Sequence, residues 1–185
     1  MNPDISVIIR DRLWSLPQCV ASCRSTKISV EIIVVDDASV DGTAAWLKSQ
    51  GDVVTIPGEG WGKPWGVTKA LSIAKGNFVR FLDSDDWLNP GSDEVQLAIA
   101  EREKADVVVS GYQLYRDQQL LGTFPWQPTD DFIARQLGEG VTQGSHYSAF
   151  LFRRSFIQDI LLFRPPTSLR VTIAASFSRL PFESR

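Results

Sequence analysis

The run EIIVV at residues 31–35 constrains the fold of this chain more than any other segment. Four β-branched apolar residues follow one another there, with no polar residue alternating between them. This pattern is typical of a strand that is buried on both faces, as in a parallel sheet covered by helices. The run therefore predicts an α/β protein.

Strand-like and helix-like segments alternate around this run. Strands are predicted at 5–9, 31–35, 53–56, 78–82, 106–112, 119–124 and 147–152, and helices at 16–23, 44–47, 68–74, 92–104 and 130–137. The strands at 106–112 and 119–124 are expected to form a hairpin, and the glycine-rich residues 58–66 form a loop. The alternation in the first half predicts a Rossmann-like, mostly parallel sheet with helices on both faces.

The length of 185 residues suits one domain, and a hydrophobic content of 43% is enough to build its core. We assign residues 1–163 to this domain. After Arg164, two prolines interrupt the pattern, and the following residues show neither regular apolar spacing nor helix caps. Residues 164–185 are therefore predicted to form an irregular C-terminal tail.

Charge and cysteine content exclude several classes of protein. The net charge of −3 lacks the basic footprint of a general nucleic-acid binder. Cys19 and Cys23 have no companions at zinc-ligand spacing, and on a helix they share one face as core thiols, which suits a reducing compartment. We find neither a secretory signal pattern nor 18 uncharged apolar residues in a row, so we expect a cytoplasmic domain without a transmembrane segment.

Acidic residues follow two of the predicted strands directly. Asp36 and Asp37 come after EIIVV, and Asp83, Asp85 and Asp86 come after FVRFL. Ligands of open α/β sheets bind at the carboxyl ends of the strands, and a divalent cation commonly bridges carboxylates to substrate phosphates. One isolated Asp-Asp pair is explained by a helix cap or turn, but two clusters in one sheet favour a ligand site. The second cluster indicates a Mg²⁺ or Mn²⁺ diphosphate site, and the first suits a base and a sugar.

In order and spacing, these motifs resemble glycosyltransferase family 2. The resemblance covers residues 4–112 and rests on ISVII, EIIVVDDASVDGT, the glycine-rich loop and AKGNFVRFLDSDDWLNP. It implies the GT-A fold, a Mn²⁺ or Mg²⁺ cofactor, and transfer of a sugar, with inversion, from a nucleotide-diphosphate donor to an acceptor hydroxyl. UDP-sugars and dTDP-sugars are both compatible with it.

The resemblance also implies roles for individual residues. Asp37 is expected to face the nucleobase, with Asp36 beside it. Asp83 and Asp85 are expected near the ribose, the diphosphate and the metal. Either Asp85 or Asp86 is the direct metal ligand.

The chain departs from the family pattern at Gly66-Val67-Thr68, where the family often has an arginine. Lys63 and Lys69 are nearby cations that can replace its charge. His146 is the only histidine, and it is read either as a residue of the metal or acceptor site or as a partly buried polar residue. Arg80 lies among apolar neighbours in a strand, and pairing with an acid is its simplest explanation.

No residue matches the family's general base. Asp130, Asp131 and Glu139 are fallback candidates, each also explained as a cap or surface acid. Two alternatives to an active transferase stay open: a nucleotide-sugar binding domain that has lost its base, and a phosphoacceptor receiver-like domain. The receiver-like domain requires an Asp after the third strand, where this chain has Pro57.

Overall fold

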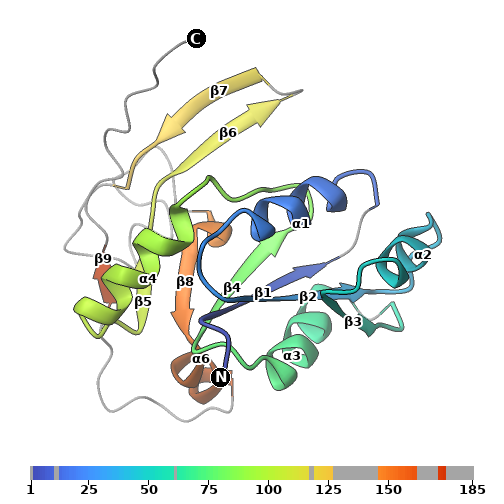
Figure 1. The fold of residues 1–185 in the computed structure, drawn as a ribbon, viewed down its shortest axis with the longest axis horizontal. Coiled ribbons are helices and arrows are strands. Elements are labelled where there is room, and N and C mark those ends of the chain that lie inside the picture. The colour runs from blue at the N-terminus through green and yellow to red at the C-terminus, as the bar shows by residue number, and fades with distance from the viewer. Residues whose placement is uncertain are drawn as a thin grey trace.

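A seven-stranded sheet organises the protein (Figure 1), as seen in a computed structural model that describes residues 2–10, 13–60, 62–116, 119–126, 146–161 and 171–173. The strand order is β3-β2-β1-β4-β8-β5-β9. Strand β8 is antiparallel to both of its neighbours, and the other pairings are parallel. The strands are β1 (Ile5–Arg10), β2 (Val30–Asp36), β3 (Val53–Pro57), β4 (Phe78–Asp83), β5 (Val107–Val109), β8 (Phe150–Arg153) and β9 (Val171–Ile173).

Helices cover both faces of this sheet, as the sequence predicted. Strands β6 (Tyr112–Arg116) and β7 (Gln119–Phe124) form a separate antiparallel hairpin beside it. The helices are α1 (Leu16–Arg24), α2 (Thr43–Lys48), α3 (Lys63–Ile73), α4 (Ser92–Arg102) and α6 (Arg154–Leu161), and η1 (Tyr147–Ala149) is a single 3₁₀ turn. Within the residues described, none of these helices is long and apolar enough to span a bilayer.

The hydrophobic core consists of separate clusters on the two faces of the sheet, because successive residues of a strand face opposite sides. Val7 and Ile9 of β1 pack with α1, α2 and α4, whereas Ile8 packs with α3 on the opposite face. Successive side chains of a strand point to opposite faces, so an unbroken apolar run supplies both cores at once. Cys19 and Cys23 are buried free thiols on α1, as the helical spacing predicted. The α/β fold class is confirmed.

Several boundaries differ from the sequence prediction. Helix α3 begins at Lys63, inside the predicted glycine-rich loop, because Gly62 takes a φ of 88° and Pro64 suits the first helical turn. The predicted strand 106–112 is split into β5 and β6 at Gly111, where an added Cβ would lie 2.5 Å from the Phe124 carbonyl oxygen. This close approach of two backbones requires a glycine.

The C-terminal part also differs. The predicted strand 147–152 becomes η1 followed by β8, and α6 was not predicted. Residues Val171–Ile173 lie in the tail predicted to be irregular, yet they form β9 on the open edge of β5. Their β-branched sequence suits a strand, and pairing with β5 supplies the hydrogen-bond partners that the tail sequence alone does not reveal. The predicted helix 130–137 lies outside the described residues.

Candidate functional site

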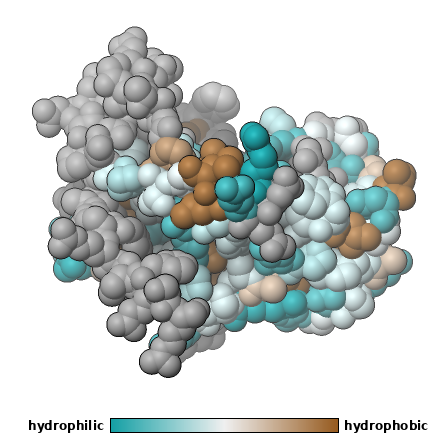
Figure 2. Space-filling view, turned by 90° about the horizontal axis from the view of Figure 1, so that it is seen from above, coloured by the Kyte–Doolittle hydropathy of each residue, from teal (hydrophilic) through white to brown (hydrophobic). Residues whose placement is uncertain are grey.

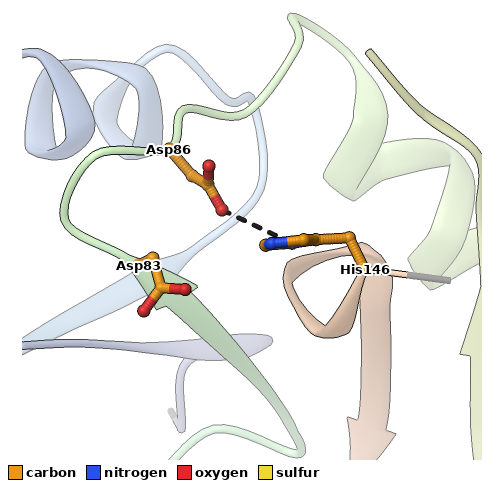
Figure 3. Close-up of side chains that lie close together, drawn as sticks. All are labelled: Asp83, Asp86 and His146. Carbon is orange, nitrogen blue, oxygen red and sulfur yellow. Dashed lines mark ion pairs between the residues drawn. The ribbon is translucent and has the colours of Figure 1, made fainter. Parts of the chain in front are cut away.

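Three ligand-type side chains converge at the carboxyl end of β4 (Figure 3). Asp83 is the last residue of β4, and the amide of Asp86 donates to the Asp83 carbonyl in the turn that follows. His146, which directly precedes η1, places Nδ1 3.5 Å from Oδ2 of Asp86. One ligand atom from each of these three residues lies within 4.8 Å of the other two, so together they have the spacing of a metal site.

A lysine from the other side of the site neutralises Asp83. Nζ of Lys63 donates to Oδ1 of Asp83 at 2.7 Å and to the hydroxyl oxygen of Tyr147 at 2.7 Å. The same ammonium lies 4.0 Å from the centre of the Tyr147 ring. Helix α3 begins at Lys63, so its first residue reaches the strand end that carries the acids.

The pKa values of the two acids move in opposite directions. Burial acts to raise the pKa of Asp83, but hydrogen bonds from Lys63 and Tyr147 outweigh it and hold the pKa below its ordinary value. Burial raises the pKa of Asp86, although a hydrogen bond from Ser148 and the nearby His146 partly oppose the rise. The negative charge of Asp86 is therefore poorly compensated without a cation, which is the situation that favours metal binding.

At the end of β2, Asp37 holds the glycine-rich loop. Its buried carboxylate accepts the amides of Gly60 at 2.8 Å and Gly62 at 2.9 Å. Asp36 accepts the amide of Ser39 at 3.1 Å and stabilises the turn after β2. Both residues lie at the carboxyl edge predicted from the sequence, and Asp37 organises the loop that leads into Lys63.

A cavity of about 200 Å³ opens beside the acidic loop, between that loop, α4, η1 and the start of β6. Aromatic side chains form much of its wall: the ring centres of Trp87 and Tyr115 are 5.0 Å apart, and those of Tyr112 and His146 are 5.9 Å apart. Asp85 and Asp86 line the same cavity. Its mixture of aromatic and acidic groups suits a polar ligand with flat apolar faces, such as a sugar.

The structure brings three of the six predicted site residues together and adds His146 to them. Lys63 contacts Asp83, which lies close to Asp86. Asp85 lines the cavity and is not a member of the group formed by Asp83, Asp86 and His146. Lys69 lies on α3 with its ammonium 5.7 Å from the Trp65 ring centre, away from these contacts. The fallback base candidates Asp130, Asp131 and Glu139 lie outside the described residues.

Two contributors were missed by sequence reasoning. Tyr147 bonds to Lys63, and Ser148 Oγ donates to Oδ2 of Asp86 at 2.7 Å. Both follow His146 directly, so the signal available was the polar run His146-Tyr147-Ser148 just before a strand. His146 itself keeps 44% of its side chain exposed, so its ring is partly covered by neighbours and can still be reached by a ligand.

Polar and apolar side chains lie next to one another on the face of the molecule seen in Figure 2. The exposed apolar side chains include Leu114, Leu120 and Leu121 of the hairpin β6–β7. Leu114 also lines the cavity. The cavity therefore borders one of the exposed apolar side chains of the hairpin.

Proteins with sequences similar to this chain are named as glycosyltransferases. EpsH of Bacillus subtilis (strain 168), named as a glycosyltransferase, is 31% identical over 152 residues, which are 76% of this chain and 43% of EpsH. WfaP of Escherichia coli, a UDP-Glc:alpha-D-GlcNAc-diphosphoundecaprenol beta-1,3-glucosyltransferase, is 30% identical over 138 residues, which are 70% of this chain and 54% of WfaP. The chain thus spans about half the length of these relatives.

The fold has a solved counterpart. The crystal structure of Staphylococcus aureus TarS 1–349 in complex with UDP-GlcNAc superposes with a TM-score of 0.68 at 19% identity, covering 85% of this chain and 47% of that one. This likeness supports the GT-A fold. The Glycosyl transferase family 2 profile matches residues 5–161, a span that includes both acidic clusters, Lys63 and His146. The chain belongs to glycosyltransferase family 2.

Proposed function

We propose that this chain binds a nucleoside-diphosphate sugar and a divalent cation at the carboxyl end of β4, and transfers the sugar with inversion to an acceptor hydroxyl. The observation that carries the proposal is the convergence of Asp83, Asp86 and His146 within 4.8 Å. The ammonium of Lys63, which donates to Asp83, adds a positive charge beside the proposed cation. A diphosphate needs several positive groups around it, and this end of the sheet supplies a lysine and a cation site.

The donor set fits Mn²⁺ and Mg²⁺. Two carboxylates are hard ligands that both ions accept, and the imidazole of His146 favours Mn²⁺, because Mg²⁺ prefers oxygen ligands and water. A cation held there stabilises the charge that develops on the leaving diphosphate. The raised pKa of Asp86 supports its assignment as a ligand, since a cation relieves the cost of its buried charge.

The other predicted residues receive roles around this centre. Lys63 is assigned to the diphosphate, for which it exchanges part of its contact with Asp83. Asp85, which faces the cavity, is assigned to the diphosphate and metal region. Asp36 and Asp37 are assigned to the nucleoside end, where Asp37 sets the position of the glycine-rich loop through Gly60 and Gly62.

A UDP-sugar is the favoured donor. WfaP is named for its use of UDP-Glc, and the TarS structure holds UDP-GlcNAc. A dTDP-sugar also suits a site of this type. The aromatic wall formed by Trp87, Tyr112 and Tyr115 beside the acidic loop is assigned to the acceptor, since flat aromatic faces pack well against sugar rings.

Donor binding without transfer is a second candidate function. It is favoured by the lining of the cavity, where the carboxylates that the described residues contribute are Asp85 and Asp86, and both belong to the loop assigned to the donor and the cation. Neither is then available as a separate base for the acceptor hydroxyl. General-base catalysis typically contributes about 10²–10⁴-fold to the rate, so a protein without it binds the donor but turns over slowly.

Thermal unfolding with UDP tests the proposal. We expect UDP to stabilise the protein in the presence of Mn²⁺ but not with EDTA, by about 2.7 kcal/mol when UDP is at one hundred times its Kd. Equal stabilisation with EDTA contradicts the cation bridge. Release of UDP from UDP-Glc or UDP-GlcNAc in the presence of saccharide acceptors separates transfer from binding alone.

A further inference from the structure

Arg80 is a buried arginine three residues before Asp83, and its contacts connect the core to the site. Only 1% of Arg80 is exposed, although it lies in β4 among apolar neighbours. Nε donates to Oδ1 of Asp93 at 3.0 Å, which confirms the acid partner predicted for it. Its other donors reach Oε1 of Gln96 and, at 2.8 Å, the carbonyl oxygen of Ser148.

Helix α4 completes this buried cluster. Gln96 is fully buried and donates from Nε2 to the carbonyl oxygen of Ala149 at 3.0 Å. Asp93 is 2% exposed and lies one turn earlier on the same helix. The cluster therefore holds two successive carbonyls of η1, those of Ser148 and Ala149, with donors from two almost wholly buried side chains.

The same turn carries the side chains that complete the site. Ser148 Oγ donates to Asp86, and Nδ1 of His146 lies 3.5 Å from the same carboxylate oxygen. Tyr147 bonds to Lys63, which bonds to Asp83. The inner face of η1 is thus held by Arg80 and Gln96, and its outer face contacts both acids.

We infer that Arg80 is a positioning residue, which acts with Gln96 through the η1 carbonyls to place His146 and Ser148 against Asp86. A buried ion pair such as that between Arg80 and Asp93 contributes little net stability compared with apolar packing, so pairing with Asp93 does not by itself account for Arg80. Partners that orient a metal ligand from behind commonly control the affinity of the site. The consequence for cation binding rests on the proposed function, whereas the positioning of His146 does not.

The single histidine makes the positioning directly measurable. The ring signals of His146 can be assigned in an NMR spectrum without further mutation, because the chain has no other histidine. In EDTA and at fixed pH, we expect Arg80→Lys and Gln96→Leu each to shift or broaden these signals. Arg80→Lys keeps a charge for Asp93 but loses the fork that reaches Ser148.

Arg153→Lys is the matched control. Arg153 lies on β8, pairs with Asp106 at 3.2 Å and donates to the Ala105 carbonyl oxygen at 2.8 Å, so it also combines an acid with a carbonyl. It makes these contacts at the far end of β8 from η1. We expect Arg153→Lys to leave the His146 signals unchanged.

Binding of Mn²⁺, followed by the loss of its free EPR signal, is the second measurement. We expect Arg80→Lys and Gln96→Leu to weaken binding by about 10–100-fold, the usual effect of removing a group that orients a metal ligand, and Arg153→Lys to leave it unchanged. If Arg80→Lys does not fold, the double variant Arg80→Met with Asp93→Leu removes both buried charges together. It is expected to fold and to shift the His146 signals in the same way.

The outcomes separate this inference from the proposed function. Unchanged His146 signals in Gln96→Leu and in a folded Arg80 variant overturn the positioning role. Signals that move equally in Arg153→Lys also overturn it, because the change then reflects general loosening of the sheet. If the signals move as expected but the wild-type protein binds no Mn²⁺, the cation site is refuted and the positioning role stands.

Discussion

The ammonium of Lys63 lies 2.7 Å from Oδ1 of Asp83, and this contact joins the start of α3 to the end of β4. The side chains keep 43% and 32% of their surfaces exposed, so the ion pair itself adds little to the free energy of unfolding. The ion pair matters because it sets the charge of the site. It offsets one acid of the cluster, whereas no lysine or arginine of the described residues pairs with the other, Asp86.

Replacement of Lys63 is expected to weaken diphosphate binding. In Lys63→Met, the ammonium assigned to the diphosphate is lost, and we expect the Kd for UDP with Mn²⁺ to rise about tenfold, the equivalent of about 1.4 kcal/mol. Titration calorimetry measures this directly. Lys69→Met on the same helix is the control and should bind UDP normally. Equal losses in both variants would mean that α3 contributes only general positive charge.

Neutralising Asp86 is expected to stabilise the metal-free protein. Burial raises the pKa of Asp86 in the folded state above its unfolded value, so its contribution to stability is present at low pH and is lost as the pH rises through that raised pKa. Asp86→Asn removes this cost at neutral pH, and its amide oxygen can still accept from Ser148. We expect the Tm in EDTA at pH 7 to rise by a few degrees, as calorimetry would show.

The same variant is expected to lose its response to Mn²⁺, because an amide is a poor substitute for an anionic ligand. The pH dependence of the free energy of unfolding provides a second check, because Asp83 and Asp86 contribute to it in opposite directions. The pKa of Asp83 is lowered, so its stabilising contribution is present at neutral pH and is lost as the pH falls through its lowered pKa. An Asp86→Asn protein that is less stable in EDTA, or that keeps the Mn²⁺ response, contradicts this assignment.

Removal of the Asp37 carboxylate is expected to loosen the glycine-rich loop. Asp37→Ala leaves the amides of Gly60 and Gly62 without their acceptor, at an expected cost of about 1–3 kcal/mol in the free energy of unfolding. UDP affinity should fall, whereas the Mn²⁺-dependent response to pyrophosphate should survive, since it uses the β4 end of the site. Asp52→Ala removes an exposed acid paired with Arg24 and is the control. It should change neither the UDP affinity nor the response to pyrophosphate.

Gly58 is expected to tolerate no side chain. A Cβ at this position would lie 2.6 Å from Oδ1 of Asp37 and 2.8 Å from its Cα, so Gly58→Ala must displace Asp37 or the loop. We expect a loss of about 1–3 kcal/mol in urea unfolding, together with weaker UDP binding. Gly51→Ala, where nothing lies within 4 Å, is the control and should be neutral or slightly stabilising. Equal stability of the two variants would show that the loop moves freely.

The sequence alone predicted the fold class and the edge of the sheet that carries the site. The unbroken run 31–35 indicated a strand buried on both faces, and the acids after it and after residues 78–82 indicated the carboxyl ends of two strands. These signals are local: apolar periodicity and the residues directly after a strand depend on neighbours in the chain. They placed Asp36, Asp37, Asp83 and Asp86 on one edge before any tertiary contact was known.

Only the tertiary structure decided which of these residues meet. His146 reaches Asp86 across 60 residues because η1 is held from behind by Arg80 and Gln96, and no local pattern records such a contact. Lys63 meets Asp83 because α3 begins earlier than its apolar spacing suggests. The sequence specified the acids, and the packing of α3, α4 and η1 around β4 selected their partners, since side chains far apart in the chain meet only when the core fixes their elements.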